Sequence, residues 1–174
     1  MKKVLCAVLA AVSLVCGLCG CAKDESTAPT FEIEFIGQSV CLPCKVKDIN
    51  GIVIDTEHSF GSYERDDGKY MSFAFYYYGD KRAGQIYLEG DCTGTSDLGE
   101  ENVIGLSVAD SSVPMSYTGL TFGSSEKDIT DMFGEQDYGK DTVLTYYIEP
   151  EGSVSFFLDT GHNVEEFLLF VDIR

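Results

Sequence analysis

The chain has 174 residues and a formal net charge of −17, from 29 Asp and Glu against 12 Lys and Arg. This length allows one ordinary domain or two very small ones. A charge of this sign argues against nucleic acid and against anionic lipid as partners.

Residues 1–20 have the organisation of a secretory signal. Lys2 and Lys3 precede an apolar run, Val4 to Leu14, that is too short to span a bilayer as a helix. We therefore expect this segment to direct export and then to be removed. Cys6, Cys16 and Cys19 would leave with it, so they do not form a metal cluster.

The signal ends in Leu18-Cys19-Gly20-Cys21, which resembles a bacterial lipobox. The resemblance implies that Cys21 is lipidated and becomes the first residue of the mature protein. The alternative is an ordinary secretory signal cut near Gly20. The polar residues 21–30 are expected to form a tether. The protein would then be extracytoplasmic and lipid-anchored to the cell membrane, in the outer leaflet of the cytoplasmic membrane if the organism is Gram-positive.

Beyond the tether, the pattern is mostly that of β-strands separated by glycine-containing turns. The expected strands are Phe31 to Ile36, Tyr70 to Tyr78, Gln85 to Asp91, Val103 to Ala109, Val143 to Glu149, Ser153 to Asp159 and Val164 to Ile173. One helix is clear, Ser125 to Phe133. Ser124 is its expected N-cap and Gly134 its terminator.

A second short helix is expected after Cys41-Leu-Pro-Cys44, because Lys47-Asp48-Ile49 matches Lys127-Asp128-Ile129 at an offset of 80. Three strands follow the match in each half. This indicates an internal repeat, with one α+β half at 31–110 and a second at 111–174.

The second half carries a recognisable motif, Gly119-Leu-Thr-Phe-Gly-Ser-Ser, a short helix and a Phe-Gly stop before a three-stranded meander. It resembles the repeat of the β-lactamase inhibitor protein and of the SmpA/OmlA (BamE) assembly lipoproteins, as in many uncharacterised lipoproteins of Firmicutes. The resemblance implies an α+β fold of two helix-plus-meander halves, with short helices on one face of an antiparallel sheet. It also implies binding or scaffolding, and it transfers no partner-contacting residue.

Cys41 and Cys44 allow three interpretations. A Cys-x-x-Cys at a helix N-terminus suits thiol redox chemistry, because the helix dipole stabilises a thiolate. The two residues could instead form a structural disulfide or remain thiols, with Cys92 as the odd cysteine. The missing βαβ context and the cap serine that matches Cys44 in the second half disfavour the redox interpretation.

Other catalytic arrangements are weaker. Ser124-Ser-Glu-Lys127 has Ser-x-x-Lys spacing, but the partner motifs of penicillin-recognising enzymes are absent from the sequence. With only His58 and His162 in the chain, a multi-histidine metal site is excluded and a serine triad is improbable. We therefore expect no catalytic residue, no metal and no cofactor.

Strand parity predicts a binding surface. Assigning the more aliphatic side of each strand to the core, Met71, Phe73 and Phe75 among them, leaves an aromatic opposite side. Its expected partner-binding residues are Tyr70, Tyr76, Tyr78, Tyr87, Tyr147, Phe157 and Phe170, interspersed with acids. Aromatic residues are typical anchors of protein interfaces. The alternative is that tyrosine merely favours strands, or that a loop covers this side.

The sequence thus predicts a lipid-anchored, non-enzymatic module that binds an unidentified envelope or extracellular protein. The alternative function is an envelope thiol–disulfide protein that uses Cys41 and Cys44.

Overall fold

The chain folds largely as antiparallel β-structure. The computed structural model describes residues 31–148 and 152–171. Its strands are β1 (Phe31–Phe35), β2 (Gln38–Leu42), β3 (Cys44–Lys45), β4 (Val53–Ile54), β5 (Gly61–Glu64), β6 (Tyr70–Tyr78), β7 (Lys81–Glu89), β8 (Asn102–Val108), β9 (Met115–Ser116), β10 (Tyr138–Lys140), β11 (Val143–Ile148), β12 (Gly152–Leu158) and β13 (Val164–Val171). Two 3₁₀ turns, η1 (Val46–Asp48) and η2 (Leu98–Glu100), and one α-helix, α1 (Glu126–Phe133), complete the regular structure of these residues. The predicted signal, Cys21 and the tether lie outside the described residues.

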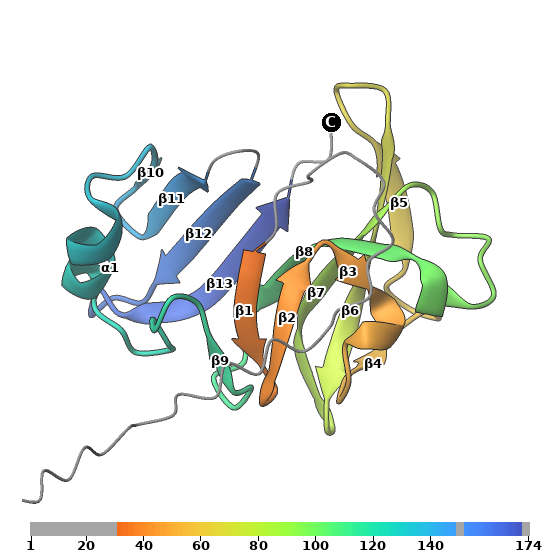
Figure 1. Ribbon diagram of the computed structural model, residues 1–174, viewed down its shortest axis with the longest axis horizontal. Coiled ribbons are helices and arrows are strands. Elements are labelled where there is room, and N and C mark those ends of the chain that lie inside the picture. The colour runs from red at the N-terminus through yellow and green to blue at the C-terminus, as the bar shows by residue number, and fades with distance from the viewer. Residues whose placement is uncertain (1–30, 149–151, 172–174) are drawn as a thin grey trace, which may run out of the picture.

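The strands form two sheets (Figure 1). The path of the larger, ten-stranded sheet is β10-β11-β12-β13-β8-β7-β6-β4, with β3 beside β8 and β5 beside β6. It contains two meanders, β6-β7-β8 and β11-β12-β13. Their last strands pair with each other, so that Leu106 of β8 lies opposite Leu169 of β13. Because of this pairing, the two meanders share continuous faces.

The predicted α+β class, with several short helices on one face, is wrong. Within the described ranges α1 is the single α-helix, and a three-stranded sheet of order β2-β1-β9 lies over the larger sheet instead (Figure 1). Ile36 and Gly37 both have positive φ, which permits the two-residue turn that returns β2 along β1. The expected helix after Cys44 is reduced to the single turn η1.

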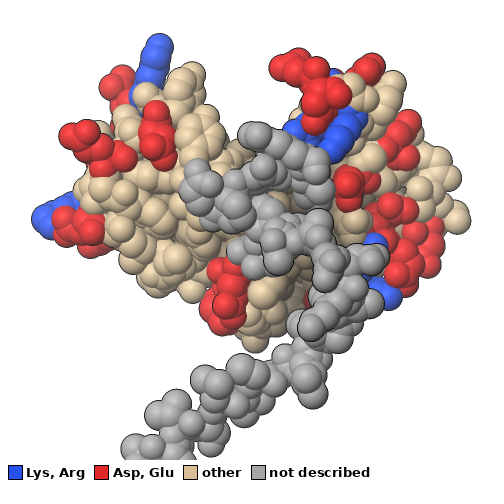
Figure 2. Space-filling view, turned by 45° about the horizontal axis from the view of Figure 1, so that its top comes forward, with Lys and Arg blue, Asp and Glu red and all other residues tan. Residues whose placement is uncertain are grey.

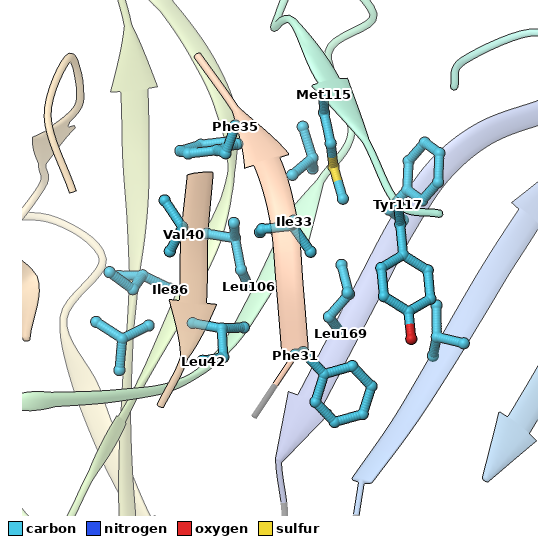
Figure 3. Packing of buried hydrophobic residues seen from close by; sticks show 14 of the residues in the cluster. Phe31, Ile33, Phe35, Val40, Leu42, Ile86, Leu106, Met115, Tyr117 and Leu169 are labelled. Atoms are coloured by element: carbon cyan, nitrogen blue, oxygen red, sulfur yellow. The ribbon is translucent and has the colours of Figure 1, made fainter. Parts of the chain in front are cut away.

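One hydrophobic core lies between the two sheets (Figure 3). Ile33, Phe35, Val40 and Leu42 alternate with exposed residues along β1 and β2, and they belong to the same cluster as Ile86, Leu106 and Leu169 of the larger sheet. Complete burial of a side chain of this size stabilises the fold by about 1.5–3 kcal/mol. The core continues across both predicted halves, since β9 pairs with β1 and β8 pairs with β13.

The predicted orientation of β6 is also wrong. Ala74 lies opposite Ile86, and Tyr76 lies opposite Gly84, so these two residues of β6 face the core. Met71, which was predicted for the core, is also buried. Ala74 and Tyr76 are fully buried, whereas Phe73 and Phe75 are half-buried on the other side. The β1-β2 hairpin packs on this side of β6, where the Phe35 ring lies edge-on against the Tyr76 ring, with centroids 6.0 Å apart.

Helix α1 begins one residue later than expected. Its N-cap is Ser125, whose Oγ accepts a hydrogen bond from Asp128 N at 3.2 Å, while Asp128 Oδ2 accepts from Ser125 N at 2.8 Å. Ser124 Oγ instead accepts from Thr121 N in the preceding turn. Ile129 is buried, and the Phe133 ring packs against Tyr146, 5.0 Å between centroids, which holds the helix on the second meander.

Candidate functional site

The side of the larger sheet opposite to the core is rich in partly exposed aromatic residues. We call it the outer face. Directly opposed residues of antiparallel strands share a face, so the register defines two cross-strand rows. One row contains Phe73, Tyr87, Gly105, Phe170, Ser153 and Tyr147; the other contains Phe75, Gln85, Ser107, Leu168, Ser155 and Thr145. The outer face is therefore aromatic over β6, β7 and β13 and carries hydroxyl groups over β11 and β12.

Gly105 is the centre of the first row. A Cβ at this position would lie 2.7 Å from Phe170 Cδ2 and 3.2 Å from Tyr87 Cδ2. Because glycine leaves this space empty, the Tyr87 and Phe170 rings approach each other edge-on, with centroids 6.1 Å apart and planes at 76°. This is a favoured aromatic geometry. The two rings thus hold each other in place.

Two arginines lie over outer-face rings. The Arg82 guanidinium carbon is 4.3 Å from the centre of the Phe75 ring, and that of Arg65, in the turn between β5 and β6, is 5.9 Å from the Phe170 ring. Such cation–π contacts contribute about 0.5–1 kcal/mol at exposed sites. Tyr63 of β5 completes this group by packing 6.2 Å from Phe73.

Acidic groups accompany the rings. Glu166 is half-buried on the outer face, opposite Phe157. Burial raises the pKa of its carboxyl, and a hydrogen bond from the Ser107 hydroxyl opposes that effect. Burial also raises the pKa of the Tyr87 phenol. Acidic side chains also outnumber basic ones elsewhere on the molecule, over the surface that Figure 2 shows.

The region over β11 and β12 is polar. Thr145 Oγ1 and Ser155 Oγ lie 2.8 Å apart and share a hydrogen bond. Tyr147 stands at the end of this region with 66% of its surface exposed, while its backbone N donates to Asp137 Oδ2 at 2.8 Å. The bond to Asp137 holds the backbone of Tyr147 in place while its ring remains open to solvent.

The structure divides the seven predicted partner-binding residues. Tyr87, Tyr147, Phe157 and Phe170 lie on the outer face. Tyr70 is exposed at the first position of β6, and Tyr78 packs against the core cluster.

Tyr76 belongs to the core, where its phenol donates to the Ser107 carbonyl at 2.9 Å. Phe73 and Phe75 take its expected place on the outer face. The signal that could have found them is Gly84, opposite Tyr76, because a glycine in a central strand often marks a place where a large ring or another backbone comes close.

Cys41, Cys44 and Cys92 are thiols, so none of the described cysteines forms a disulfide. Cys41 is exposed on β2, and Cys44 is half-buried on β3. Burial, followed by the nearby Asp48 and Cys41, raises the pKa of the Cys44 thiol to about 12. Thiol exchange requires a thiolate near neutral pH. The environment of Cys44 therefore works against redox chemistry.

Neither a membrane helix nor a metal cluster was found within 31–148 and 152–171. No helix there is long and apolar enough to cross a bilayer. Those residues also bring together no group of three or more His, Cys, Asp or Glu side chains that could hold a metal ion.

The chain matches no protein-family model, and no curated protein or solved structure is significantly similar to it. The resemblance of residues 119–134 to the β-lactamase inhibitor protein repeat and the assembly lipoproteins stays a prediction.

Proposed function

We propose that the protein is a non-catalytic module that binds another protein through the outer face of its larger sheet. A lipid on Cys21 would hold it on the extracytoplasmic side of a membrane. The observation that carries the proposal is the row of Phe73, Tyr87 and Phe170 on a sheet face that no described element covers completely, with Tyr147 open at its end. A partly exposed group of this composition is typical of protein interfaces.

Preorganisation favours a protein partner. The Tyr87 and Phe170 rings are fixed by Gly105, and the Phe75 and Phe170 rings are fixed by the arginines above them. Rings that are already ordered lose little side-chain entropy on binding. The outer face would thus provide rigid anchors for apolar side chains of the partner.

Charge indicates the character of that partner. A net charge of −17 repels acidic surfaces and accelerates association with basic ones. We therefore propose a partner whose contacting surface is apolar at its centre and basic around it. The thiol–disulfide alternative is less well supported, because the raised pKa of Cys44 keeps its thiol protonated.

The size of the assembly in membranes tests this proposal. The full chain, extracted from its native membrane with a mild detergent, should migrate on a native gel as a complex larger than the chain alone. Replacing Tyr63 and Tyr147, which are 46% and 66% exposed at the two ends of the outer face, by Glu should return it to single-chain size. Burial of two new carboxylates in an apolar interface is costly.

The matched control is Met132→Glu on α1, a residue that is 48% exposed and away from the outer face. It should leave the complex intact. Thermal melts of all variants establish that each is folded. A complex that survives the double tyrosine change, or a wild-type chain that migrates alone, would overturn the proposal.

A further inference from the structure

A second candidate site lies away from the outer face, between two loops of the first meander. It is a cavity of about 550 Å³. One wall is formed by η1 and the segment that follows it as far as Phe60, and the other by residues 93–99. We call it the loop cavity. Its volume lies within the range of about 300–1,000 Å³ that is usual for small-molecule sites.

The walls of the loop cavity come largely from two connections that are longer in the first meander than in the second. Residues 49–69 lead from η1 to β6, whereas residues 134–142 suffice between α1 and β11. Residues 90–101 join β7 to β8, whereas residues 159–163 join β12 to β13. Two separate extensions of the first meander thus meet at one place.

Polar contacts hold the two walls together. Lys47 Nζ lies 2.7 Å from Glu100 Oε1, and Lys45 Nζ donates to the Glu100 carbonyl at 2.7 Å. The backbone N of Val46 donates to the Glu101 carbonyl at 3.1 Å. The second wall is shaped by Asp97, whose Oδ1 accepts from Gly99 N at 2.9 Å at the start of η2. These contacts between protein groups fix the two walls of the loop cavity relative to each other.

The lining has a definite chemical character. Ile49 and Leu98 are buried, and Phe60 is half-buried against the core, so these three give the loop cavity an apolar floor, while most of its accessible lining is polar. Threonine and serine hydroxyls surround it, and Asp97 is the single charged residue of the lining. Lys and Arg do not contribute to the lining. Lys47 interacts with Asp97, but its ammonium is already paired with Glu100 Oε1 at 2.7 Å. An anion would therefore find only a base that is already paired, whereas a cation would find a carboxylate, hydroxyl oxygens and an aromatic ring.

We propose that the loop cavity binds a small organic cation that carries an apolar group. The apolar group would occupy the floor formed by Ile49, Phe60 and Leu98, and the cation would lie near Asp97. This site is independent of the outer face, so it stands even if the protein has no protein partner.

Three probes that share a phenyl group and differ in charge test the proposal: 2-phenylethylamine, 2-phenylethanol and phenylacetate. Each is titrated into the full chain, extracted from the membrane with a mild detergent, while amide NMR signals of Thr95 and Leu98 are followed. The amine, a cation at pH 7, should bind about two- to fivefold more tightly than the alcohol, which is the effect of an exposed ion pair. Phenylacetate should bind most weakly. About 1 M NaCl, which shortens the screening length to about 3 Å, should narrow these differences.

Variants of the lining test the role of the Asp97 charge and the location of the probes separately. Asp97→Asn retains an oxygen for Gly99 N and should remove the preference for the amine over the alcohol. Thr56→Trp, at an exposed lining position, should block all three probes, whereas Val53→Trp, at a position that is 67% exposed and does not line the loop cavity, should not. Equal shifts for the three probes, no shift with the amine, or undiminished binding to Thr56→Trp would each overturn the proposal.

Discussion

Several glycines of the larger sheet lie beneath aromatic rings of neighbouring strands. A Cβ on Gly61 would lie 2.9 Å from Phe73 Cζ, one on Gly105 would lie 2.7 Å from Phe170 Cδ2, and one on Gly152 would lie 2.1 Å from the Phe31 ring. Glycine weakens a strand, since it adds backbone entropy and has no side chain to pack. Here the rings occupy the space that a side chain would have filled, and they restore the lost contact.

Gly105→Ala should destabilise the fold by about 1–3 kcal/mol, the usual result of overpacking a filled site. The new methyl would displace Phe170 and separate it from Tyr87. Urea unfolding measures the loss, and near-UV circular dichroism reports the disturbed rings. Gly94→Ala is the control, because a Cβ there would meet no atom within 4 Å. Equal stability of the two variants would contradict the described packing.

Tyr76→Phe should cost about 1–2 kcal/mol, because it removes a buried hydrogen bond to the Ser107 carbonyl. Tyr78→Phe, at a half-buried position, should lower the free energy of unfolding only slightly.

Burial also raises the pKa of Tyr76 above its ordinary value of 10.0. The stability that depends on its proton is complete below pH 10 and is lost as the pH rises through the folded-state pKa. Tyr76→Phe should therefore show a shallower loss of stability above pH 10 than the wild type. Unfolding curves at pH 7, 10 and 11 measure both effects; a cost for Tyr76→Phe no larger than that for Tyr78→Phe would contradict the burial of the Tyr76 hydroxyl.

Individual strands could be predicted more reliably than their arrangement. The runs that begin at Tyr70, Val103, Val143 and Val164 all form strands within a residue or two of the predicted starts, because alternation and glycine turns are local signals. The β1-β2-β9 layer could not be predicted in this way. β9 has two residues, and the proline and cysteines after Ser39 suggested a helix start where β2 ends.

Which side of a strand faces the core could not always be predicted from the sequence of that strand alone. Along β6, both sides are apolar, and the choice of the more aliphatic side placed Met71, Phe73 and Phe75 in the core. The correct side is decided by the β1-β2 hairpin, whose Phe35 ring packs edge-on against Tyr76. Four of the seven predicted outer-face aromatics were placed correctly because β7, β11, β12 and β13 have one clearly more aliphatic side.

Ser125→Ala should weaken α1 by about 1 kcal/mol, within the usual range for loss of an N-cap. Ser124→Ala should destabilise the protein less, since it removes an acceptor only from the exposed turn before the helix.

The Ser125 hydrogen bonds lower the pKa of Asp128. The stability that these hydrogen bonds contribute to the folded state is present above pH 3.8 and is lost as the pH falls through the lower folded-state pKa of Asp128. The Ser125→Ala penalty should therefore shrink in strong acid. Thermal melts at pH 7 and pH 2.5 test this; an equal penalty at both would contradict the role assigned to Asp128.

At the scale of the whole molecule, two meanders share one core, and an acidic domain presents an aromatic outer face. Lipidation would add a fixed location to this arrangement. Two acyl chains give stable membrane attachment, whereas a single chain gives marginal attachment. A tethered module needs only modest affinity for a partner in the same membrane, because the anchor raises their effective concentration.

Cys21→Ser should leave the precursor unlipidated and uncut by the lipoprotein peptidase. Metabolic labelling with a fatty acid, followed by comparison of molecular mass, measures both changes in the full chain. Cys92→Ser, a change outside the lipobox, is the control and should be labelled normally. If the Cys21→Ser chain still fractionates with membranes at its mature size, the lipid anchor is not at Cys21.

Site-specific photo-crosslinking tests the outer-face interface most directly. A photoreactive phenylalanine analogue replaces Tyr63, Tyr147 or Met132 in the full chain within its native membrane, and the covalent adducts are compared after irradiation. We predict that positions 63 and 147 yield an adduct with the same protein, although β5 and β11 are far apart in the sheet order, and that position 132 on α1 does not yield it. No shared adduct from positions 63 and 147, or the same adduct from position 132, would contradict binding through the outer face.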